Sequence, residues 1–150
     1  MIISTKHLSR DLKIIGVLAF VFAVLYIRGI DVLIYFLNFL TFLSAGIVYF
    51  TLAAGVSRRE KWAWFSGVGI FILSIIIALA SLLFGLVSPF QIIIGLIIPV
   101  LFLITFIRAK QEITINKKRS VAPFILFVIS FLLNLFSNIY LIYLFYLEIS

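Results

Sequence analysis

The chain has 150 residues, of which 65% are hydrophobic and 11% are charged, and its mean hydropathy is +1.36. Soluble domains are about 45–50% apolar and about 25% charged, so the composition excludes an ordinary soluble domain and predicts an all-α integral membrane protein. The absence of cysteine excludes disulfides, thiolate chemistry and cysteine-bound metals. The net charge of +7 would suit a nucleic-acid partner in a soluble protein, but here the placement of the charges explains it better, and no nucleic-acid partner is expected.

The first two predicted spans are residues 12–30 and 32–54. Lys13 and Arg28 lie near the ends of the first span, where their long side chains can reach outward to water. Gly29 can end this helix, and Asp31 is a favourable N-cap for the next. A signal peptide is the other reading of a basic start before an apolar run, but Arg28 lies where the small-residue cleavage site would be needed.

The third predicted span is residues 59–84. Gly55 is a candidate terminator of the preceding helix. The stretch Ser57-Arg58-Arg59-Glu60 matches a capping box, with Ser57 as the cap and Glu60 three residues later.

The fourth and fifth predicted spans are residues 89–107 and 121–147. Ser88 can cap the fourth, with Pro89 at the first helical position, and Ser120 can cap the fifth. Pro99 lies in the middle of the fourth span and is expected to kink it.

The lysines and arginines test this count of five transmembrane helices. If the N-terminus is cytoplasmic, eleven of the twelve basic residues fall on the cytoplasmic side, and Arg28 is the exception. Such an excess is the signature of cytoplasmic loops. The sequence therefore predicts a single bundle over residues 1–150, with a cytoplasmic N-terminus, an external C-terminus and a location in the cell (plasma) membrane.

One loop carries a resemblance to known proteins. Residues 55–64 read GVSRREKWAW, a short basic cluster followed by Trp-Ala-Trp. This stretch, together with the span pattern, resembles small prokaryotic multi-span membrane proteins of unknown function, in which such a loop joins the second and third spans. The resemblance implies a small membrane protein and no particular activity. A fifth span departs from the four of those proteins.

Ionisable residues are absent from the interior of every predicted span. Charged groups inside a bilayer are costly and mark ion pathways, proton relays or metal sites, whereas the acids here fall at span ends or in loops. The single histidine, His7, precedes the first span. No carboxylate pair or metal-ligand cluster is apparent, so we expect no catalytic activity, no cofactor and no metal site.

Neutral polar residues do occur inside the spans. Ser130, Asn134 and Ser137 have the spacing of one helix face, with Asn138 beside them. Asn134 lies about 20 Å above the cytoplasmic end of its span, and Asn38 lies about 10 Å below the external end of its own. In a hydrocarbon core of about 30 Å these depths coincide. We therefore predict that Asn38, Asn134, Ser137 and Asn138 make polar contacts between helices; the alternative is that they line a small polar cavity.

The most basic stretch is KQEITINKKRS, residues 110–120. Lys117, Lys118 and Arg119 are candidates for contacts with anionic lipid headgroups, at about 1 kcal/mol each. The alternative is that they only set the topology.

Three classes of function remain open from the sequence. The first is a non-catalytic structural or accessory subunit of a larger membrane protein complex, with other subunits, further copies of the chain and membrane lipids as partners. The second is a small oligomeric channel or facilitator for a small neutral solute. The third, a membrane enzyme, is disfavoured because no acids or histidines cluster.

Overall fold

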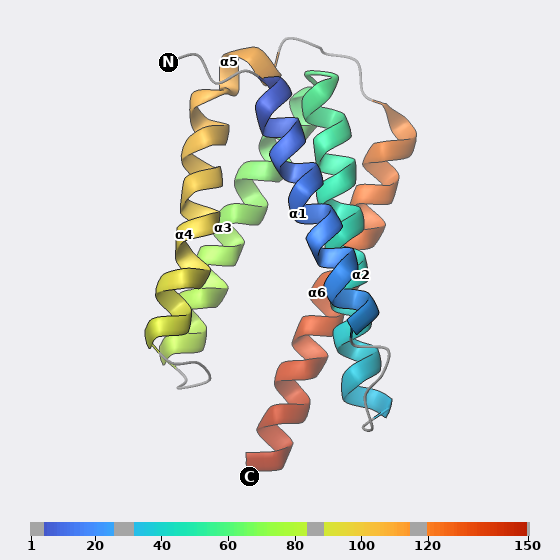
Figure 1. Cartoon of the computed structure of the whole chain (residues 1–150), viewed down its shortest axis with the longest axis vertical. Helices are drawn as coiled ribbons and strands as arrows, with labels where there is room; N and C mark the ends of the chain where they lie inside the picture. Colours follow the sequence, from blue (N-terminus) through green and yellow to red (C-terminus); the bar gives the residue numbers. More distant parts are fainter. Residues whose placement is uncertain (1–4, 26–31, 84–88, 115–119, 150) are drawn as a thin grey trace. The chain divides into compact units, whose positions relative to one another are not determined.

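The computed structural model describes residues 5–25, 32–83, 89–114 and 120–149. Six helices make up this part of the chain (Figure 1): α1 (Thr5–Leu25), α2 (Val32–Ser57), α3 (Lys61–Leu83), α4 (Pro89–Arg108), the short α5 (Lys110–Ile113) and α6 (Val121–Ile149). The predicted all-α class is confirmed for the described residues.

Three stretches of helix are long and apolar enough to cross a membrane: Tyr35–Ser57, Lys61–Ala80 and Val121–Leu144. They lie in α2, α3 and α6, and all three correspond to predicted spans. A shorter apolar stretch, Leu96–Arg108, lies in α4. The first helix starts at Thr5, well before the predicted span 12–30, and so also includes the charged residues Lys6, Arg10 and Asp11.

The predicted boundary between the second and third helices is wrong. Gly55 and Ser57 lie inside α2, so Gly55 does not end that helix and Ser57 does not cap α3. The chain turns later, at Arg59, which has a left-handed φ of 56° and donates its backbone N–H to the Val56 carbonyl over 3.0 Å. A left-handed residue just past the last turn is a common way to end a helix, usually with glycine.

Helix packing divides the chain into two compact units. Unit 1 comprises Met1–Leu8 and Val56–Arg119, and unit 2 comprises Ser9–Gly55 and Ser120–Ser150. The prediction of one bundle over residues 1–150 stays a prediction.

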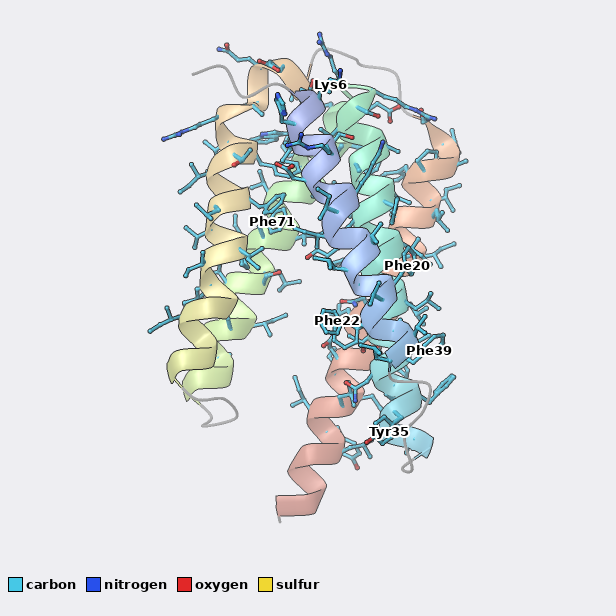
Figure 2. All side chains as sticks on the ribbon, in the orientation of Figure 1. Lys6, Phe20, Phe22, Tyr35, Phe39 and Phe71 are labelled. Carbon is cyan, nitrogen blue, oxygen red and sulfur yellow. The ribbon has the colours of Figure 1, made fainter. Side chains whose placement is uncertain are left out.

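Unit 1 is built on a hairpin of α3 and α4, with α5 at one end of it (Figure 1). Phe71 on α3, labelled in Figure 2, stacks on Phe102 of α4 at 5.1 Å between ring centroids and lies 5.7 Å from Phe106. Gly67, one turn earlier, allows this approach, because a Cβ there would lie 2.2 Å from the Phe106 ring. Aromatic pairs at such distances add to the free energy of burial.

Unit 2 is built from α1, α2 and α6. Two glycine–phenylalanine contacts join α1 to α2: the Phe50 ring covers Gly16, and the Phe20 ring, labelled in Figure 2, covers Gly46. The two rings lie 5.6 Å apart. Small residues that let helix backbones approach are typical of packing within membranes.

Large apolar side chains are exposed along all five long helices, α1, α2, α3, α4 and α6. They include Val21 on α1, Phe36 on α2, Ile76 on α3, Leu101 on α4 and Ile129 on α6. So many exposed apolar side chains are typical of a protein in contact with lipid or with another protein.

Candidate functional site: a hydroxyl and amide cluster between α2 and α6

The polar residues of α6 face α2 within unit 2. The Asn134 side chain donates through Nδ2 to the backbone carbonyl of Thr41 over 2.8 Å and to the Ser44 hydroxyl over 3.2 Å. Both acceptors lie on α2, so one amide group makes two contacts between the helices. Hydrogen bonds of this kind in bilayers stabilise helix pairs by about 0.6 kcal/mol on average.

A hydroxyl pair extends the cluster by one turn. Thr41 donates through Oγ1 to the Ser137 hydroxyl over 2.9 Å, and Ser137 donates onward to the Asn134 carbonyl over 3.0 Å. Ser44 donates to the Thr41 carbonyl over 3.0 Å. The side chains of Ser44 and Ser137 are both 0% exposed. Every hydroxyl in the cluster therefore has an acceptor inside the protein.

Asn138 acts within its own helix. Its Nδ2 donates to the Asn134 carbonyl over 2.8 Å and to Asn134 Oδ1 over 3.2 Å. This second bond occupies the oxygen of the Asn134 amide and leaves its nitrogen directed at α2. Asn138 thus positions Asn134 through these two contacts within α6.

Asn38 lies one turn before Thr41 on α2. Asn38 is half-buried, and it is not without an interaction partner. The prediction that Asn38 contacts another helix stays a prediction. The Asn134 nitrogen is engaged by Thr41 and Ser44. Neither Thr41 nor Ser44 was among the residues predicted to make polar contacts between helices. The signal for both was their spacing of three residues, which places two hydroxyls on one face of α2.

The chemistry available to this cluster is limited to neutral hydrogen bonding. Asn134, Asn138, Thr41, Ser44 and Ser137 carry no ionisable group, and a serine needs an adjacent base to become a nucleophile. Among the described residues, no buried side-chain nitrogen or oxygen lacks a hydrogen-bond partner. A cluster that is satisfied in this way can fix which helix faces meet and in which register.

Lys117, Lys118 and Arg119, the predicted contacts to anionic lipid, lie outside the described residues. The neighbouring helix α5 is described, and its Glu112 carboxylate accepts the backbone N–H of Thr5 over 3.2 Å. This contact ties the start of α1 to α5 within unit 1.

A second polar group surrounds the two tryptophans of unit 1. Glu60 is only 2% exposed, and its carboxylate accepts the indole N–H of Trp62. Trp64 donates its indole N–H to the Phe106 carbonyl over 2.7 Å. That carbonyl lies in the last turn of α4, where helix carbonyls lack partners in their own helix. Nothing in the sequence indicated that Glu60 would be buried.

Comparisons with models of protein families, with curated proteins and with solved structures give no match for this chain.

Proposed function

We propose that this chain is a non-catalytic, multi-pass protein of the plasma membrane that serves as a structural or accessory subunit of a larger membrane complex. The main support is the combination of a satisfied polar cluster and uncovered apolar helix faces. Asn134, Thr41 and Ser137 use their hydrogen bonds on each other, which suits a role in fixing helix contacts. The exposed apolar faces of α3, α4 and α6 offer surface to lipid, to other subunits or to a second copy of the chain.

The topology belongs to the proposal. Five spans with a cytoplasmic N-terminus and an external C-terminus place eleven of the twelve basic residues on the cytoplasmic side. In this arrangement α1 and α4 also cross the membrane, with the charged first turns of α1 at the cytoplasmic surface. A kinship with the small prokaryotic membrane proteins that carry a basic Trp-Ala-Trp loop is part of the same proposal.

The absence of enzymatic activity is also proposed, on the grounds of side-chain chemistry. The acids and the single histidine lie at the ends of the predicted spans or outside them. The Asn134 cluster supplies neutral donors and acceptors, which can bind a small neutral solute but cannot act as a general acid or base near neutral pH.

The test is the composition of the particle that the chain occupies after gentle extraction from its native membrane. Native mass spectrometry on an affinity-tagged chain should find other subunits with it in a fixed ratio. A tagged membrane protein of the same size and abundance is the control for chance association. Recovery of the chain alone, or with copies of itself only, would contradict the accessory role.

The second candidate is a small oligomeric channel or facilitator for a neutral solute. Pro99 inside α4 favours it, because a proline removes a backbone hydrogen bond from a helix and can bend it. Osmotic swelling of vesicles that contain the purified chain tests this function directly. Faster swelling in a neutral solute than in empty vesicles would support it, provided that the rate falls when Asn134 is replaced by leucine.

A further inference from the structure

Two lysines and two aromatic rings form a continuous row in unit 1, at the end of the apolar stretch Lys61–Ala80. Lys61 Nζ lies 5.6 Å from the centre of the Phe65 ring, and Lys110 Nζ lies 5.1 Å from that of Trp64. The two rings meet edge to face, with 4.9 Å between their centroids. We call these four residues the cation–aromatic row.

The row is held in place by the backbone. Lys61 and Phe65 are four residues apart on α3, so they share one face of that helix. Trp64 is half-buried, and its bond to the Phe106 carbonyl at 2.7 Å fixes the indole against α4. Lys110 approaches from the first residue of α5. Each ring therefore holds one ammonium group, and the two rings are themselves in contact.

Neither ammonium is neutralised by a carboxylate among the described residues. One ion pair in that part of the chain joins Arg10 to Asp11 on α1. The acids nearest in sequence are engaged elsewhere, since Glu60 is buried with Trp62 and Glu112 accepts the Thr5 N–H. The row thus presents two positive charges that an external anion can satisfy.

An apolar stripe continues from the row along α3. Phe65, Ile72 and Ile76 lie on the same helix face as Lys61, and all are exposed, Phe65 to 57%. Lys61 is the first residue of a stretch long and apolar enough to cross a membrane. The charges thus lie where lipid headgroups are found, and the stripe runs toward the hydrocarbon.

We propose that the cation–aromatic row and this stripe bind an anionic phospholipid, with its phosphate between Lys61 and Lys110 and an acyl chain along Phe65, Ile72 and Ile76. Charge complementarity selects the headgroup, and the apolar stripe selects a lipid over free phosphate. The proposal rests on α3 crossing the membrane and is independent of an accessory or channel role. It concerns residues other than Lys117, Lys118 and Arg119.

The experiment uses tryptophan fluorescence of the full chain in phosphatidylcholine vesicles. Brominated phosphatidylglycerol or brominated phosphatidylcholine is added at equal mole fraction, and quenching reports which lipid lies beside the two tryptophans, Trp62 and Trp64. Each lysine near an anionic headgroup favours it about fivefold, so two lysines predict a relative binding constant of about thirtyfold for phosphatidylglycerol. Raised salt should lower this preference, since exposed charges are screened.

The tryptophan fluorescence of the double variant K61Q/K110Q should be quenched equally by the two brominated lipids. Its matched control is K13Q, which removes one exposed lysine from α1 and should retain the preference. K61R/K110R, which keeps both charges, should retain it as well and shows that the surface still folds. Equal quenching in the unchanged chain, or a preference that survives in K61Q/K110Q, would overturn the proposal. If inorganic phosphate abolishes the preference for phosphatidylglycerol while another salt of the same ionic strength does not, the proposal is also overturned. The site would then bind phosphate rather than a lipid.

Discussion

The Thr41 hydroxyl on α2 donates to the Ser137 hydroxyl on α6 over 2.9 Å, and Ser137 is fully buried. This side-chain bond joins two helices that are ninety-six residues apart along the chain. It lies beside the Asn134 bonds to Thr41 and Ser44, so the contact between α2 and α6 rests on a compact set of neutral donors and acceptors. Its contribution can be separated from that of the surrounding apolar contacts.

Replacing Thr41 by valine and Ser137 by alanine, singly and together, forms a double-mutant cycle for this bond. We expect a coupling free energy of about 0.6 kcal/mol and at most about 1.7 kcal/mol, the range found for hydrogen bonds between helices in bilayers. The measurement is the free energy of unfolding in mixed micelles, from titration with a denaturing detergent. Thr41→Val keeps the shape of the side chain and removes only the hydroxyl.

The matched control is Thr105→Val on α4. Thr105 donates to Leu101 of its own helix over 2.7 Å, so its loss should couple to Ser137→Ala by less than the error of the measurement. A coupling near zero between Thr41 and Ser137 would mean that the bond contributes nothing beyond packing.

Gly67 and Gly69 offer a matched pair on α3. A Cβ at Gly67 would lie 2.2 Å from the fully buried Phe106 ring, whereas a Cβ at Gly69 would have nothing within 4 Å. We expect Gly67→Ala to lower the free energy of unfolding by about 1–3 kcal/mol through overpacking. Gly69→Ala should raise it by up to about 1 kcal/mol, because alanine has the higher helix propensity.

Phe106→Leu in the Gly67→Ala background should recover part of that loss, since the shorter side chain leaves room for the new methyl group. The same detergent titration serves for all these variants. Equal effects of alanine at positions 67 and 69 would show that α3 and α4 do not meet at Gly67.

Arg59 tests the turn between α2 and α3. With its φ of 56°, any residue with a Cβ is strained there and glycine is not. Arg59→Gly and Arg59→Ala remove the same charge, so we expect the glycine variant to be about 1 kcal/mol more stable than the alanine variant. At Arg58 the order should reverse or vanish, because its φ is not positive. An alanine variant at position 59 as stable as the glycine variant would contradict the left-handed turn.

The sequence was sufficient for the helical class and for the approximate position of most helices. The apolar runs, Pro89 and Ser120 marked where α4 and α6 begin, because proline and serine have strong preferences at helix starts. The end of α2 was mispredicted. Gly55 and Ser57 lie inside α2 despite their cap signals. Glu60 is buried and accepts the Trp62 indole N–H, a contact that depends on tertiary packing.

The polar cluster was predictable in part. The spacing of Asn134 and Ser137 gave their shared face, and hydropathy gave the environment in which neutral polar groups must find partners. Which residues of α2 would meet them depends on the crossing of two helices distant in sequence, and depth in the membrane alone pointed to Asn38 as well as to its neighbours. The short helix α5 and its contact from Glu112 to Thr5 had no sequence signal, since four residues carry no periodicity.

The predicted topology can be tested because the chain contains no cysteine. Single cysteines at Arg28 and at Lys117 place one thiol at the predicted external end of the first span and one in a predicted cytoplasmic loop. In intact cells a membrane-impermeant maleimide should label R28C and leave K117C unlabelled until the membrane is permeabilised. The unchanged chain, which has no thiol, is the control for background. If K117C is labelled in intact cells and R28C is protected, the orientation is the reverse of the predicted one. If both are labelled, an even number of spans lies between residues 28 and 117, which contradicts the three that the five-span topology requires.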